Sequence, residues 1–312
     1  MNVKQHVINN IPPSAEFMLR CIKAAKDRYV PKKPKTSASV PQQPCSAITT
    51  DDLRTILENL NIFPGDVLML HSNSDAINRL GWTPTDMIDF LLEYLGPSGT
   101  LAMPSHPKLK EEDGHKIYLP HRCPSYVGLV TELFRRRKQT LRSLYPFSAA
   151  AAQGERAEEL IADHRHSFAP HDEKSPYAKL AVMKGKTLAL GCALDRMTIL
   201  HVAEDTMRDV MPIDDFYVSE DVLIRTPNEE FTLRTHCRAP WLWWYLAKYQ
   251  WTKHMYRQGF VRENCICGVP LREIDATAAI EWMQQRVRKG KTIYPYAKMN
   301  RFFHFKNMPG KE

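Results

Sequence analysis

The chain has 312 residues and a formal net charge of +8, with 43% hydrophobic and 25% charged residues. This composition is typical of a soluble globular protein, and it excludes disordered, collagen-like and membrane-embedded chains, whose compositions differ strongly. The excess of Lys and Arg lies mainly near the chain ends and in short runs such as "RRRK" from Arg135 to Lys138, and it matches no recognisable nucleic-acid module. We therefore expect no nucleic-acid partner.

The chain also lacks the patterns of export and of metal binding. No uninterrupted apolar stretch reaches the roughly 18 residues of a membrane span, and the N-terminus lacks the basic-then-apolar order of a signal peptide. The seven cysteines are scattered and odd in number, without paired Cys-x-x-Cys motifs. These features predict a cytoplasmic protein with reduced thiols and no bound metal.

The two ends of the chain differ from its middle. Residues 14–30 are predicted to form an amphipathic helix, and the Pro-, Ser- and Lys-rich stretch after it is typical of a linker. We expect residues 1–46 to be an accessory segment, 47–290 one main domain, and 291–312 a basic aromatic tail. Solvated tails are one interpretation, and peripheral contact with a membrane or another anionic surface is the alternative.

The main domain alternates between helices and strands. It begins with a helix in "TTDDLRTILENLNI", a strand in "GDVLMLHSN", a capped helix in "TPTDMIDFLLEYLG" and a strand in "GTLAMPSHP". Helices follow in "VGLVTELFRRRK" and "GERAEELIADHR", and a strand in "GKTLALGC". A hairpin turning at residues 226–228, a helix in "WLWWYLAKYQWTKHMYRQG" and a helix in "IDATAAIEWMQQRVRKG" complete the pattern. This alternation predicts a layered α/β domain.

Polar segments follow three of the predicted strands. They are "HSNSD" from His71 to Asp75, "PSHP" at residues 104–107, and "LDRMTILHVAED" at residues 194–205. Ligands of α/β sheets collect where strands end, so we expect these segments to converge at one edge. The glycine-rich dinucleotide and P-loop signatures are absent, which disfavours a Rossmann dehydrogenase and a nucleotide hydrolase.

Taken in order, several segments resemble the aminoglycoside 3-N-acetyltransferase family. They are "LNIFPGDVLMLHSNSD", "LLEYLGPSGTLAMPSH", "VGLVTELFRRRKQTLRSLYPFSAAAAQGERAEEL", "SPYAKLAVMKGKTLALGCALDRMTILHVAED" and "GFVRENCICGVPLREIDA". The resemblance implies a layered α/β/α fold with a mixed sheet. It also implies acetyl transfer from acetyl-CoA to an amine of an amino sugar or aminoglycoside, in a ternary complex without an acyl-enzyme and without a metal.

On this resemblance the catalytic pair is His201 and Glu204, with Asp195 at another family-typical position. The chemistry agrees, because an ammonium must lose a proton before it attacks a thioester, and histidine titrates near neutral pH. Helical residues three apart share a face, so Glu204 can accept a hydrogen bond from His201. Without the resemblance, an ordinary core histidine is the simpler interpretation. Asp195 is expected either to cap the helix that carries His201 or to take part in catalysis.

The cofactor candidates come from two matched segments. "HSNSD" matches the family's "HSS" segment, which contacts coenzyme A, with Asn73 in place of the usual second serine. "RSLYPFS" matches "RS-x-HP-x-x-S", with Tyr145 in place of histidine. A structural salt bridge of the arginine is the alternative for the second segment. The candidate cofactor contacts are His71, Ser72, Asn73, Ser74, Arg142 and Ser143.

The acceptor candidates are His106, Asp205 and Asp209. Seven acidic residues and one basic residue lie between Glu204 and Asp221, and an acidic rim would attract a polycationic amine. A solvated loop is the alternative. The cysteines at positions 192, 265 and 267 are expected to be packed thiols rather than nucleophiles.

Two other functions remain open. One is a biosynthetic acyltransferase that modifies a nucleotide-linked or surface-polysaccharide amino sugar rather than an antibiotic. The other is a non-catalytic module that binds coenzyme A. The sequence leaves open which amine is the acceptor, the acyl chain length and the oligomeric state.

Overall fold

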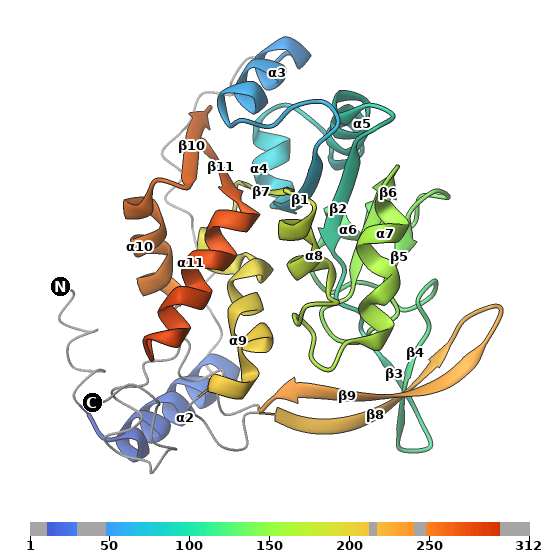
Figure 1. Cartoon of the computed structure of the whole chain (residues 1–312), viewed down its shortest axis with the longest axis vertical. Coiled ribbons are helices and arrows are strands. Elements are labelled where there is room, and N and C mark those ends of the chain that lie inside the picture. The colour runs from blue at the N-terminus through green and yellow to red at the C-terminus, as the bar shows by residue number, and fades with distance from the viewer. Residues whose placement is uncertain (1–10, 30–47, 212–216, 240–247, 294–312) are drawn as a thin grey trace.

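The computed structural model describes residues 11–29, 48–211, 217–239 and 248–293 (Figure 1). Most of the predicted linker and most of the C-terminal tail lie outside these ranges, so the boundaries of the accessory segments stay predictions. The predicted N-terminal helix is present as α2, Pro13–Tyr29. No helix in the described ranges is long and apolar enough to cross a membrane.

A seven-stranded mixed sheet forms the centre of the main domain. Its order is β10-β11-β7-β1-β2-β6-β5. The strands are β1 (Val67–Ser72), β2 (Thr100–Pro104), β5 (Leu141–Arg142), β6 (Ala150–Gly154), β7 (Lys186–Leu190), β10 (Val261–Ile266) and β11 (Val269–Asp275). β1 pairs in parallel with β2 and β7, whereas the outer pairs are antiparallel. The three parallel strands therefore end at the same edge of the sheet.

Helices pack on both faces of this sheet (Figure 1). Along β1, Leu68 and Leu70 belong to one buried core, and Val67 and Met69 belong to another, as the two-residue period of a strand requires. The first core includes residues of α3 (Thr50–Asn59), α4 (Ser74–Arg79), α5 (Pro84–Leu95) and α6 (Leu129–Arg135). The second includes residues of α7 (Ala157–Ile161), α8 (Pro176–Val182), α9 (Val202–Thr206) and α11 (Ala276–Arg288). The predicted α/β/α layering is confirmed.

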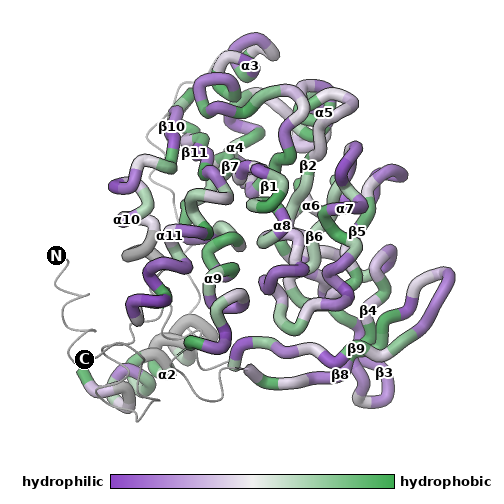
Figure 2. Tube along the Cα trace, in the orientation of Figure 1, coloured by the Kyte–Doolittle hydropathy of each residue, from purple (hydrophilic) through white to green (hydrophobic). Residues whose placement is uncertain are grey.

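A second sheet of four strands extends beside the main one. Its order is β3-β4-β8-β9, with β3 at Lys110–Glu112, β4 at His115–Tyr118, β8 at Tyr217–Arg225 and β9 at Glu230–Arg238. β8 and β9 form the predicted hairpin, and β4 pairs in parallel with β8. The hairpin reaches away from the helical layers in Figure 1 and carries mostly hydrophilic residues in Figure 2. Nothing in the sequence analysis predicted β3, β4 or their pairing.

Local sequence explains where several helices begin and end. Thr49 and Thr83 each form a capping box, with Asp52 and Asp86 respectively, at the starts of α3 and α5. The predicted helix in "GERAEELIADHR" is shorter than expected, because α7 passes into a 3-10 helix at Ala162–His166. Of the predicted aromatic-rich helix, α10 is described over Lys248–Gln258, and residues 240–247 lie outside the described ranges.

The cysteines depart from expectation at two described positions, because Cys265 is exposed rather than packed and Cys267 is not a free thiol. Cys267 is disulfide-bonded, so the prediction that all seven cysteines are reduced thiols is wrong. Its backbone has a φ of 52° at the tight turn between β10 and β11, a geometry that sequence spacing does not reveal. The free thiols among the described residues are at positions 21, 123, 192, 237 and 265.

Candidate active site

The polar strand-end segments lie around two adjoining cavities. The larger has a volume of about 1010 Å³ and is lined by His106, Asp195 and His201, among others. The smaller has a volume of about 340 Å³ and is lined by His71, Ser72 and again His106. The two cavities share four lining residues, which are His106, Tyr126, Arg196 and Thr198. The predicted convergence of the three segments at one edge of the sheet is confirmed.

His201 and Glu204 lie at a junction between two kinds of helix. Thr198–His201 forms a 3-10 turn and α9 begins at Val202, so the expected single helix carrying both residues is wrong. Both side chains are buried. His201 Nδ1 and Glu204 Oε2 are 3.6 Å apart, an ion-pair distance that is longer than a hydrogen bond. The two residues are brought together, with the carboxylate beside the imidazole.

Asp195 lines the larger cavity rather than capping a helix. It lies in a 3-10 turn, Leu194–Arg196. Neither the turn that contains His201 nor α9 has a side-chain cap, so the interpretation of Asp195 as the cap of that helix is wrong. Its carboxylate is 4.0 Å from the Arg196 guanidinium. The position leaves Asp195 available to a molecule in the cavity.

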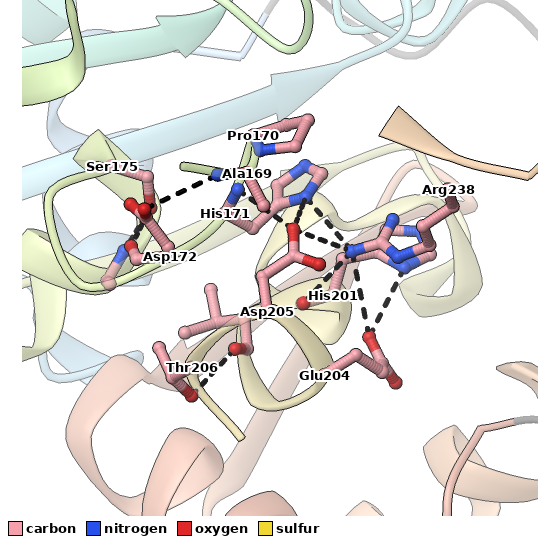
Figure 3. A network of polar contacts seen from close by, with 12 residues as sticks. Ala169, Pro170, His171, Asp172, Ser175, His201, Glu204, Asp205, Thr206 and Arg238 are labelled. Atoms are coloured by element: carbon pink, nitrogen blue, oxygen red, sulfur yellow. Dashed lines mark hydrogen bonds and ion pairs between the residues drawn. The ribbon is translucent and has the colours of Figure 1, made fainter. Parts of the chain in front are cut away.

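A buried polar network lies behind the pair (Figure 3). Asp205 Oδ2 accepts hydrogen bonds from the His171 backbone N–H at 3.0 Å and from Arg238 Nη2 at 3.0 Å, and it lies 2.9 Å from His171 Nδ1. Asp205 Oδ1 accepts a hydrogen bond of 2.8 Å from the Tyr217 hydroxyl. Arg238 Nη2 also donates to the His201 carbonyl oxygen at 3.2 Å and lies 3.8 Å from Glu204 Oε2. Arg238 therefore links the two buried carboxylates to the backbone of His201.

The network fixes the charge of Asp205. Burial alone would raise the pKa of this carboxyl, but the Arg238 charge and the contact with His171 outweigh burial and lower it. The pKa of the Tyr217 hydroxyl is raised by burial and by the neighbouring Asp205 charge, so this hydroxyl stays a hydrogen-bond donor. Asp205 is an ionised carboxylate with its partners inside the protein.

The structure places His106 in the wall of both cavities, and the other two predicted acceptor residues outside them. Asp205 is fully buried in the network and lines neither cavity, because its oxygens bind the protein itself. Asp209 is exposed and also lines neither cavity. Of the predicted acidic rim, Glu220 lines the larger cavity and Asp221 pairs with Arg234 at the surface. Positions 214 and 215 lie outside the described residues.

The first group of cofactor candidates lies beside the smaller cavity. His71 and Ser72, at the end of β1, line it directly. Asn73 is the N-cap of α4, where its side-chain oxygen accepts a hydrogen bond from the Asp75 N–H at 2.8 Å. Ser74 is the first residue of α4. The substitution of serine by Asn73 therefore keeps a capping side chain at this turn.

Arg142 and Ser143 are committed to other partners. The Arg142 guanidinium donates to three backbone carbonyls, those of Ser105, Pro120 and Cys123. Among the described residues it forms no ion pair, so the alternative salt bridge is wrong. Ser143 is buried, and its hydroxyl accepts a hydrogen bond from the Ala150 N–H at 3.0 Å. Neither residue lines either cavity. Their hydrogen bonds hold the β5 region together, and a cofactor contact of either residue stays a prediction.

Comparisons with known proteins identify the family. A sequence model of the family described as aminoglycoside 3-N-acetyltransferase matches residues 69–288. The chain belongs to this family.

Among its relatives, aminoglycoside N(3)-acetyltransferase IV of Salmonella sp. is 38% identical over 148 residues, which are 47% of this chain and 55% of that protein. Aminoglycoside N(3)-acetyltransferase IX of Micromonospora chalcea is 29% identical over 185 residues, 50% of this chain and 62% of that protein. The matched part therefore spans little more than half the length of these relatives.

Solved acetyltransferase structures share the fold. AAC-IIIb in a binary complex with CoASH superposes with a TM-score of 0.66 at 25% identity, covering 77% of this chain and 98% of that one. The apoenzyme of AAC(3)-IVa gives a TM-score of 0.65 at 27% identity, covering 81% and 94%. The three-layer arrangement of this chain is thus the acetyltransferase fold.

Several site residues of this family member were missed by the sequence analysis. His171 lies four residues before Ser175, the N-cap of α8, in a loop without periodicity. Arg238 and Lys116 come from the second sheet, whose pairing was not predicted in full. The histidine in "FAPHDEKSP" was visible as a polar residue before a helix start, but the other two had no local pattern. No group of three or more potential metal ligands occurs in the described part of the chain.

Proposed function

We propose that the protein transfers an acetyl group from acetyl-CoA to a primary amine of an amino sugar or aminoglycoside. The observation that carries this proposal is the pair of adjoining cavities with His201 in the wall of the larger one. Acetyl-CoA would reach the shared residues through the smaller cavity, past His71 and Ser72. The acceptor would occupy the larger cavity, so that both substrates meet in a ternary complex.

His201 would act as the general base. Its Nδ1 is the nitrogen near Glu204, so Nε2 is the nitrogen that can take a proton from the acceptor ammonium. Glu204 would stabilise the imidazolium that forms, and Arg238 holds the His201 backbone in place. The freed amine nitrogen then bonds to the thioester carbonyl carbon. The carbon–sulfur bond breaks, and the thiolate leaves with the proton returned by the imidazolium. The neutral imidazole then takes the second proton from the newly bonded nitrogen and releases it to solvent, which leaves a neutral amide.

The test is thiol release from acetyl-CoA by the full chain with apramycin, sisomicin and glucosamine as acceptors. His201→Asn should lower kcat by about 10²- to 10⁴-fold, the usual contribution of general-base catalysis. His115→Asn is the matched control, because His115 lies on the exposed start of β4 and lines neither cavity.

Two outcomes would contradict the proposal. An unchanged rate for His201→Asn would exclude this residue as the base. Binding of coenzyme A without acetyl transfer to any amine would favour the non-catalytic module instead.

A further inference from the structure

An ion pair forms part of the wall of the larger cavity. Lys116, on β4, and Glu220, on β8, both line this cavity, and their Nζ and Oε1 atoms are 2.5 Å apart. The parallel pairing of β4 with β8 brings the two side chains together, with Lys116 in register with Val222. The carboxylate thus already holds a primary ammonium, that of a lysine, at the cavity wall.

The surroundings of Cys237 place both charges at the same wall. Cys237 also lines the larger cavity. The pKa of its thiol is raised to about 12, mainly by burial; the charges of Asp205 and Glu220 add to the rise, and those of Arg238 and Lys116 oppose it. The next residue along β9, Arg238, belongs to the network behind His201. Glu220 on β8 and Cys237 on the neighbouring β9 therefore line the same cavity as the proposed base, His201.

The Lys116–Glu220 ion pair is exposed enough for a ligand ammonium to replace the lysine. The side chains of Lys116 and Glu220 are 43% and 35% exposed. Exposed ion pairs contribute little, equivalent to a factor of about two to five in an equilibrium constant. Lysine is a flexible point charge on a four-carbon stem and can turn to solvent, whereas the shorter glutamate stays on its strand. A ligand ammonium can therefore replace the lysine at Glu220 at small cost.

We propose that Glu220 is a specificity-determining residue that binds a second ammonium group of the acceptor, and that Lys116 occupies this subsite until the acceptor arrives. This inference rests on the proposed acetyl transfer and narrows its acceptor to an amino sugar with at least two amines. One amine would face His201 while another displaces Lys116. An acceptor with a phosphate would instead use Lys116 and leave Glu220 unpaired.

An acceptor with a second amine and an acceptor with a phosphate predict opposite effects of Lys116→Gln on binding. Titration calorimetry would measure the binding of apramycin to the full chain without acetyl-CoA. Glu220→Gln should weaken binding about twofold to fivefold, because the ammonium loses its counter-charge. Lys116→Gln should tighten binding about twofold to fivefold, because it removes the competing cation. Asp221→Asn is the control, since Asp221 pairs with Arg234 outside the cavity and should leave binding unchanged.

The expected tighter binding of apramycin by Lys116→Gln cannot result from misfolding, because a misfolded variant would bind apramycin more weakly. Weaker apramycin binding by Lys116→Gln, or unchanged binding by Glu220→Gln, would overturn the inference. So would tight binding of glucosamine 6-phosphate that depends on Lys116. Thiol release with the same apramycin distinguishes the two proposals: binding with these signs but no transfer would contradict the acetyltransferase function alone.

Discussion

Replacing Arg238 with methionine would test the buried network directly. Arg238 is 6% exposed, and its guanidinium lies 3.0 Å from Asp205 and 3.8 Å from Glu204, which are both fully buried. Methionine fills much of the same space but carries no charge. Removing one partner of a buried ion pair costs about 3 to 5 kcal/mol of unfolding free energy, because the remaining charge stays buried.

The contacts of Asp205 explain why the loss should stay within that range. At an effective dielectric of about 20, the attraction across 3.0 Å is about 5.5 kcal/mol. Asp205 keeps its bonds from the His171 backbone and from Tyr217 in the variant, which limits the net cost. Glu204 keeps His201 at 3.6 Å. We therefore expect Arg238→Met to lose about 3 to 5 kcal/mol at pH 7.

Equilibrium urea unfolding at pH 7 and at pH 4 would measure this loss. In the native protein the pKa of Asp205 is lowered, so its stabilising contribution is present above the unfolded value and is lost as the pH falls through the folded value. In Arg238→Met the Arg238 charge no longer lowers the pKa of Asp205, so burial raises this pKa. The variant then takes up a proton more readily as the pH falls, and its deficit against the wild type should shrink.

The matched control is Arg234→Met on the same strand. Arg234 pairs with Asp221 at the surface, with side chains 63% and 55% exposed, so its loss should have little effect on stability. A deficit below about 1 kcal/mol for Arg238→Met would contradict the role of Arg238 as the counter-charge, and so would a deficit of equal size at pH 4 and pH 7.

Three further substitutions test other parts of the fold. Burial raises the pKa of Glu273 to about 7. Its contribution to stability is therefore present at low pH and is lost as the pH rises from about 4.5 to 7. Glu273→Gln should flatten the decrease in unfolding free energy over this pH range, as measured by urea unfolding. Gly191 has a φ of 66°, and a Cβ added there would lie 2.1 Å from the Cβ of Ala76. Gly191→Ala should therefore lower the melting temperature. An unchanged melting temperature would contradict this packing. The Tyr145 hydroxyl donates to the Phe168 carbonyl at 3.0 Å, and Tyr145→Phe should cost about 1 to 3 kcal/mol and speed hydrogen exchange in the loop at residues 167–172.

Local sequence was sufficient to predict helices and strands whose signals lie within a few residues of one another. Thr49 and Thr83, each followed three residues later by aspartate, mark helix starts that the structure reproduces. The apolar run of β1, buried on both faces, predicted a central strand between helical layers. Because these features depend on neighbours within a few residues, the main helices, the central strands and a layered α/β domain could be predicted. The α/β/α arrangement with a mixed sheet came from the family resemblance.

The tertiary structure decided which polar residues meet. The sequence placed His201 and Glu204 three residues apart, and with the family resemblance this was enough to select them. It could not show that His171 and Asp205, 34 residues apart, lie in contact, or that Arg238 on a separate sheet forms ion pairs with Asp205 and Glu204. It also suggested Arg142 for the cofactor, although backbone carbonyls bind that guanidinium. Hydrogen-bond partners of buried charges are chosen by proximity after folding, which no local pattern in the chain encodes.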